Sequence, residues 1–172
     1  MLVLRCTHRV LSLFGQKRRE VSVSPEGEGL GEWYVRVADE SDGVLFVCTN
    51  ARSLYTLILG AEVHGLKSVQ DLAEAMLRRL FQHLYELGVE GASLSRIAED
   101  YAQLVVGKSA SRSVIGSMND LMEHLYFHAG QQMADTGKLD LRAIEEELNV
   151  IPQRPIGWAF AKDRLVELCS RM

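Results

Sequence analysis

The residues from Ser111 to Leu121 carry an unusual density of small and polar side chains. Arg112 and Ser113 supply a guanidinium and a hydroxyl, which are groups that bind phosphate, whereas Asn119 and Asp120 supply oxygens that accept hydrogen bonds. Nothing in this stretch is a recognised catalytic signature. The chemistry that these residues suggest is therefore binding, and the sequence leaves open whether a reaction accompanies it.

A single helix over 113–129 is the element predicted to position these side chains. Lys108 and Ser109 lack the full set of preceding glycines of a phosphate-cradling loop, which argues strongly against that alternative. Apolar residues placed at 100° steps fall within one arc of about 140°, as in an amphipathic helix. They are Val114, Ile115, Met118, Leu121, Met122, Leu125, Tyr126 and Ala129.

The opposite face of this helix has two unusual residues among polar ones. Gly116 in a helix interior costs about 1 kcal/mol relative to alanine, which suggests that another backbone approaches closely. Phe127 lies where a solvated helix normally carries Lys or Glu. Either a loop or the C-terminal helix covers this face and makes Phe127 a core residue, or the face binds a partner. In the second case the binding residues are Gly116, Asn119, Asp120 and Phe127, with Glu123 and His124 beside them.

Two further sites on this helix have simpler explanations. An anion could dock at the helix start beside Arg112 and Ser113, although serine capping explains the same hydroxyls. His124 and His128 are four residues apart and could share a metal ion with Asp120, but no third ligand has a secure position. Solvated histidines are the favoured interpretation, and we expect no metal and no cofactor.

The rest of the chain predicts an α+β fold, with a small mainly antiparallel sheet packed against several amphipathic helices. One domain over 1–172 is expected, with a flexible loop at 16–31. The expected strands are 2–6, 33–38, 44–49, 54–59 and 104–107, with a turn at Asp42-Gly43 between the second and third. The expected helices follow Thr7, span 68–87, 93–102 and 113–129, include Leu141 to Leu148, and close the chain at 162–170.

Composition limits the classes of partner. The net charge of −4 and the pI near 5.7 argue against nucleic acid, and the basic run Lys17 to Arg19 is interpreted as a charged loop. Three distant cysteines without metal-ligand spacing are expected to be buried free thiols. The chain has no signal-peptide pattern and no apolar run long enough for a membrane span, so we expect a cytoplasmic protein without a membrane partner.

The run Arg112-Ser113-Val114-Ile115-Gly116-Ser117-Met118-Asn119-Asp120 resembles the hallmark of an uncharacterised bacterial domain family, which shares RSV(I/L)GSMND. The start Leu-Val-Leu-Arg-Cys-Thr, the run 31–34 and the strand 45–50 are similar to the same family. The resemblance covers nearly the whole chain. It implies one bacterial, cytoplasmic domain and assigns no activity, ligand or catalytic residue.

Together these observations favour a non-enzymatic binding or assembly module that uses the face of the 113–129 helix. Its partner is a second copy of the chain, as in a homodimer, or another protein. The alternative is a small enzyme or ligand-binding protein for a phosphorylated or nucleotide-like molecule at Arg112, Ser113 and Asn119. An enzyme needs a concave pocket with converging titratable groups, whereas an assembly face is broad and apolar at Phe127.

Overall fold

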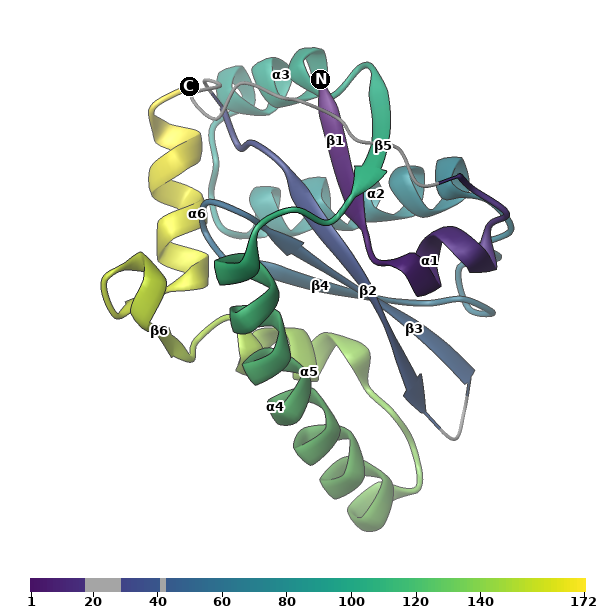
Figure 1. The fold of residues 1–172 in the computed structure, drawn as a ribbon. Helices are drawn as coiled ribbons and strands as arrows, with labels where there is room; N and C mark the ends of the chain where they lie inside the picture. Colours follow the sequence, from purple (N-terminus) through teal and green to yellow (C-terminus); the bar gives the residue numbers. More distant parts are fainter. Residues whose placement is uncertain (18–28, 41–42) are drawn as a thin grey trace.

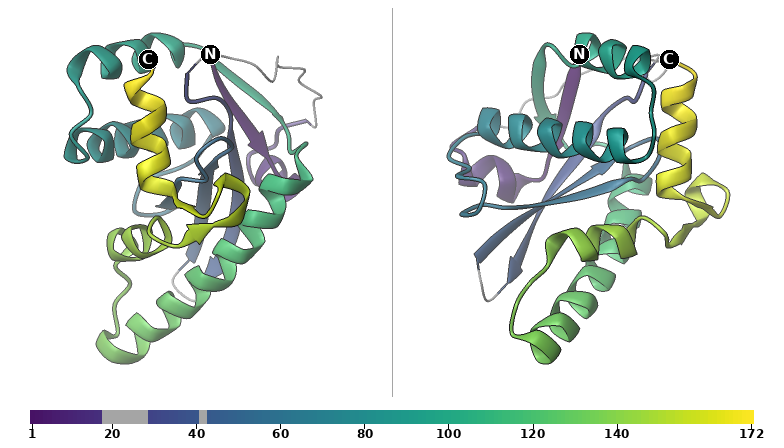
Figure 2. Two further views of the ribbon diagram at one scale, coloured as in Figure 1. Left: turned by 90° about the vertical axis from the view of Figure 1, so that its left-hand side faces the viewer. Right: turned by 180° about the vertical axis from the view of Figure 1, so that it is seen from behind.

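The computed structural model describes residues 1–17, 29–40 and 43–172, which form a mixed sheet with helices on both faces (Figures 1 and 2). The strand order is β4-β3-β2-β1-β5. Strand β1 is parallel to both of its neighbours, β2 and β5, whereas the pairs β2–β3 and β3–β4 are antiparallel. The strands are β1 (Leu2–Cys6), β2 (Trp33–Glu40), β3 (Gly43–Asn50), β4 (Thr56–Gly60) and β5 (Leu104–Lys108).

Side chains alternate between the two faces of the sheet, and each face has its own apolar core. One core lies under α1 (His8–Leu13), α2 (Val69–Glu86), α3 (Gly91–Asp100) and α6 (Ala161–Ser170). The other lies under α4 (Arg112–Thr136) and α5 (Leu141–Leu148). A short hairpin of β6 (Pro152–Gln153) and β7 (Ala159–Phe160), with a 3-10 turn over Arg154–Ile156, joins α5 to α6.

The two long helices begin at serines, as serine capping predicts. Ser68 Oγ accepts a hydrogen bond from the Asp71 N–H at 3.1 Å, and Ser111 Oγ accepts one from the Val114 N–H at 3.3 Å. Helix α4 continues past the expected end at 129 and closes at Gly137, whose φ of 65° suits glycine. The turn expected at 135–137 is therefore mostly the last helical turn, because Gly130 does not interrupt the helix.

The α+β class is confirmed, and within the sheet two strand pairs are antiparallel and two are parallel. The three cysteines are buried free thiols, as expected, and burial raises the pKa of Cys6 to about 12. The flexible loop expected at 16–31, with Arg18 and Arg19, lies mainly outside the described residues. No helix in the described ranges combines the length and the apolar character that crossing a membrane requires.

Candidate functional site on helix α4

The segment that leads from the carboxyl end of β5 into α4 is tied to the carboxyl end of β1 and to β2. The Ser109 N–H donates to the carbonyl of Cys6 at 3.1 Å, and the Ser111 N–H donates to the hydroxyl of Tyr34 at 3.0 Å. From β1 the chain turns to the α1 face of the sheet, whereas from β5 it turns to the α4 face. This divergence is a topological switch point, the position where open sheets with parallel strands commonly bind ligands.

The predicted site residues divide into two groups along α4. Arg112 and Ser113 are exposed in the first turn, and Asn119 accepts a hydrogen bond from Arg36 of β2. Phe127 follows Ser113 by fourteen residues, which is about 20 Å along a helix. One small ligand therefore cannot contact both the start of α4 and Phe127. The six predicted residues form two separate surfaces, one at the helix start with Arg112 and Ser113 and one farther along the helix with Phe127.

The outer face of α4 is open in the described structure. Phe127 is 66% exposed, so the interpretation that a loop or the C-terminal helix makes it a core residue is wrong. No described atom would lie within 4 Å of a Cβ added at Gly116. The close backbone approach expected there is not made by the described part of this chain.

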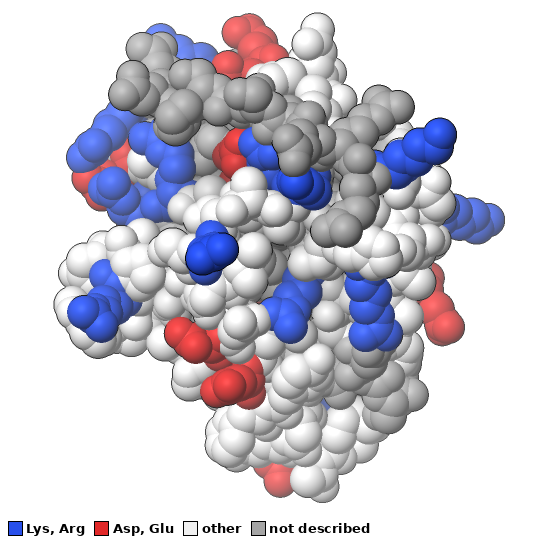
Figure 3. All heavy atoms as spheres, viewed as in Figure 1, with Lys and Arg blue, Asp and Glu red and all other residues white. Residues whose placement is uncertain are grey.

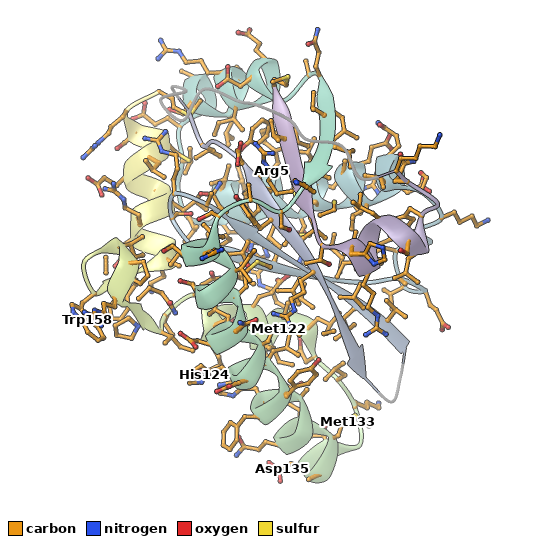
Figure 4. The ribbon with its side chains drawn as sticks, viewed as in Figure 1. Arg5, Met122, His124, Met133, Asp135 and Trp158 are labelled. Atoms are coloured by element: carbon orange, nitrogen blue, oxygen red, sulfur yellow. The ribbon has the colours of Figure 1, made fainter. Side chains whose placement is uncertain are left out.

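The two sides of α4 differ in character. Met122, on the side of α4 toward the sheet, is buried, and His124 is exposed on the far side (Figure 4). Acidic groups lie over the middle turns of α4, and basic groups surround its start (Figure 3). Asp120 and Glu123 are both exposed. Within the described ranges no three His, Cys, Asp or Glu side chains are close enough to hold a metal ion.

A second polar cluster, which the sequence analysis missed, lies between α2, α5 and β4. Glu145 is fully buried, and its carboxylate accepts a hydrogen bond from Arg79 Nη2 at 2.7 Å. His83 Nε2 lies 3.4 Å from the same carboxylate, and His83 Nδ1 is 2.8 Å from the hydroxyl of Tyr55. The arrangement fits a neutral imidazole that accepts from Tyr55 and turns its Nε2–H toward Glu145.

The same cluster covers the outer edge of β4. The Ile58 N–H donates to Glu145 Oε1 at 2.7 Å. The side-chain amide of Asn149 accepts from the Thr56 N–H and donates to the Thr56 carbonyl, each at 2.8 Å. Glu145 and Asn149 are four residues apart on α5, so they occupy one face of the helix. The cluster thus has a structural role that is independent of any ligand.

Burial dominates the acid–base behaviour of this cluster. The pKa of His83 is lowered to about 4, mainly by burial and in part by the positive charges of Arg142 and Arg79. Burial raises the pKa of Glu145, against the hydrogen bonds from Arg79 and the Ile58 N–H, and it raises the pKa of Tyr55. A half-open cavity of about 450 Å³ adjoins the cluster. Its lining includes Tyr55, His83, Leu87, Arg142, Asn149 and Lys162.

A signal for this cluster exists in the sequence. At 100° steps His83 falls in the middle of the apolar stripe of α2, and Glu145 falls beside that of α5. A charged or titratable residue at such an angle is either buried with partners or functional. The pairing itself spans more than sixty residues, which periodicity cannot reveal.

The comparisons with known proteins give a family without an assigned activity. None of the curated proteins matches the chain. A family model described as a domain of unknown function, DUF6933, matches residues 3–164. Because the match extends over nearly all of the described sheet and helices, the chain belongs to the DUF6933 family.

Proposed function

We propose that the protein is a non-enzymatic binding module, and that the outer face of α4 holds a basic segment of a partner protein. The observation that carries the proposal is Phe127, which is 66% exposed on that face. Burying a phenylalanine side chain contributes roughly 1.5–3 kcal/mol, and aromatic anchors of this kind dominate many interfaces. A partner pocket of the size of one phenyl ring would therefore gain most of its affinity here.

The charge beside Phe127 supports a basic partner. Glu123 and Asp120 precede Phe127 by four and seven residues, so the three side chains share one face. Two copies of this face would bring their carboxylates together, which is unfavourable, whereas Lys or Arg on a foreign segment would be complementary. The open backbone at Gly116 lets such a segment approach the helix closely. The family resemblance supports a bacterial, cytoplasmic setting for this encounter.

Site-specific photocrosslinking in bacterial cells tests the proposal. Phe127 is replaced by p-benzoylphenylalanine, and Tyr85, which is 76% exposed on α2, receives the same replacement as a matched control. We expect a protein adduct from position 127 only, and its loss when Glu123→Lys is added. Equal adducts from both positions, or an adduct that survives the charge reversal, would contradict the proposal.

Binding of the crosslinked protein, once purified, gives the quantitative test. Phe127→Ala should weaken the affinity about 10-fold to 100-fold without changing the melting temperature, because the side chain is exposed in the free protein. Raising the salt concentration should weaken binding of the unmodified protein, because opposite charges attract across the interface. An affinity that Phe127→Ala leaves unchanged would show that Phe127 is not the anchor.

A second candidate function, binding of a phosphate-bearing small molecule, is favoured by the topological switch point. Arg112 and Ser113 lie there at the N-terminus of α4, where unpaired N–H groups favour anions. Asn119 would act by holding Arg36 rather than by contacting the ligand. Calorimetry with inorganic phosphate and with ATP should then give binding that Arg112→Ala removes and Lys162→Ala retains. Absence of binding to the unmodified protein would remove this candidate.

A further inference from the structure

Strand β5 is an open edge of the sheet. The Leu2 N–H donates to the carbonyl of Gln103 at 2.7 Å, and the Ser109 N–H donates to the carbonyl of Cys6 at 3.1 Å. Backbone groups alternate in direction along a strand, so those of Leu104 and Val106 point away from β1. No described backbone or side-chain group bonds to these outward N–H and C=O groups of Leu104 and Val106. Such a row of unpaired groups is a template for another strand.

We propose that two copies of the chain pair through their β5 strands in antiparallel fashion, about a two-fold axis at Val105. Leu104 then lies opposite the second copy's Val106, and the two residues exchange both of their outward hydrogen bonds. The symmetry-related pair, Val106 and the second copy's Leu104, exchanges two more, which makes a ladder of about four backbone hydrogen bonds. The five-stranded sheets of the two copies become one continuous sheet.

The sequence of β5 is self-complementary in this register. Val105 meets its own symmetry mate on one face, and Leu104 meets Val106 on the other, so apolar side chains lie opposite apolar ones at these three positions. Lys108 lies opposite the second copy's Ala102. The two Lys108 side chains are thus separated by about 20 Å along the strands, which exceeds the screening length at physiological salt. A second copy therefore fits this edge without charge repulsion.

The other edge of the sheet limits the assembly to two chains. The outward N–H groups of Thr56 and Ile58 on β4 are already bonded to Asn149 and Glu145. A further copy finds neither N–H group available at those positions, so the joined sheet cannot grow at its ends by the same mechanism. The closed two-fold pair is the expected product rather than a filament.

Charge-swapped variants test both the surface and its register. Light scattering over a dilution series should give twice the chain mass for the unmodified protein at the higher concentrations. V105E and V105K should each be monomeric, because like charges face each other at the axis, and an equimolar mixture should recover the dimer mass. V63E is the matched control, since Val63 is 82% exposed beyond β4, and it should dimerise normally.

Three results would overturn the proposal. One is a monomeric mass for the unmodified protein at every concentration. Another is a dimer that persists in both V105E and V105K, and the third is a mixture of the two that stays monomeric. Circular dichroism verifies that each variant is folded. V106P, which removes one outward N–H without adding charge, is the second variant, and a folded, dimeric V106P would also refute the pairing. F127D should leave the dimer intact, which separates this surface from the one on α4.

Discussion

The two edges of the sheet, β4 and β5, present their backbones in opposite ways. On β4 the outward N–H groups of Thr56 and Ile58 and the carbonyl of Thr56 are bonded to side chains from α5 and its C-cap. On β5 the outward groups of Leu104 and Val106 have no bonding partner in the described part of the chain. An edge strand thus need not be protected by Pro, by charge or by a bulge. Two side chains one helical turn apart can take the place of a neighbouring strand.

The β4 edge shows why the substitutes are Glu145 and Asn149. A carboxamide has a donor and an acceptor at the spacing of a peptide group. The Nδ2 and Oδ1 atoms of Asn149 therefore make the two hydrogen bonds to Thr56 that a residue of a neighbouring strand would make. A carboxylate is a stronger acceptor, but its burial requires a cation nearby, and Arg79 supplies it at 2.7 Å. The capped edge is therefore also where buried charge is concentrated.

Proline at the middle residue of each edge strand should give the largest contrast. Ile58→Pro removes an N–H bonded to Glu145 and replaces a buried side chain, which should cost at least about 4 kcal/mol and leave the protein largely unfolded. Val106→Pro removes an outward N–H that is unpaired within one chain, so it should cost only about 1 kcal/mol. Urea denaturation measures both. Similar losses for the two variants would refute the distinction between the edges.

Removal of the buried carboxylate should have the next largest effect. Glu145→Ala leaves the Arg79 guanidinium and the Ile58 N–H without their acceptor, and we expect a loss of about 3–5 kcal/mol in the free energy of unfolding. Glu147→Ala, two residues farther along α5, is the control. Glu147 is exposed, so its loss should change the free energy of unfolding by less than about 0.5 kcal/mol. If both variants are equally stable, Glu145 does not cap the edge.

Acid should weaken the capped edge through His83. Its pKa is about 4 in the folded protein and about 6.5 when unfolded, so the unfolded chain binds the extra proton over this range. Stability should thus be complete above pH 6.5 and fall by about 3 kcal/mol on acidification to pH 4. The raised pKa of Glu145 offsets part of this loss.

The His83→Gln variant isolates the contribution of the imidazole. Arg79 and Arg142 face the ring and lower its pKa, whereas Glu86 and Glu146 act in the opposite direction. Urea denaturation at several pH values between 7 and 4 should show a clearly flatter profile for the variant. An unchanged profile would mean that the acid sensitivity arises from other groups.

The smallest effect on stability is expected at Phe127. Because this side chain is 66% exposed, Phe127→Ala should change the free energy of unfolding by less than about 0.5 kcal/mol. Leu125→Ala on the buried side of the same helix should cost about 2–5 kcal/mol. Thermal or urea denaturation compares the two. A large loss for Phe127→Ala would place its ring in contacts that the described residues do not account for.

The local elements were predictable from the sequence, and the contacts between distant elements were not. Helix α2 and the β2–β3 hairpin have the apolar spacing and turn residues of their type, so their existence follows from short segments. The parallel placement of β1 between β2 and β5 depends on pairing across about a hundred residues, which no local pattern specifies. The capping of β4 by α5 is of the same kind.

For the candidate site, the sequence predicted which residues share the face of α4 but not what covers them. The 100° rule placed Phe127, Asp120 and Gly116 on the side away from the apolar stripe, and the exposures agree. Exposure depends on where every other element packs, so the two interpretations of Phe127 could be separated only by the fold. The interaction of Asn119 with Arg36 was missed because Arg36 is on β2.

The position of β1 also has a consequence during synthesis on the ribosome. Its second neighbour, β5, follows β2 by more than sixty residues, which take roughly 3 to 13 s to translate. Throughout that interval, a nascent chain that has paired β1 with β2 leaves the other edge of β1 without a neighbouring strand. The growing chain would then be most vulnerable to aggregation before β5 exists. Codon changes that slow translation between residues 60 and 104 should accordingly lower the yield of folded protein without altering its final stability.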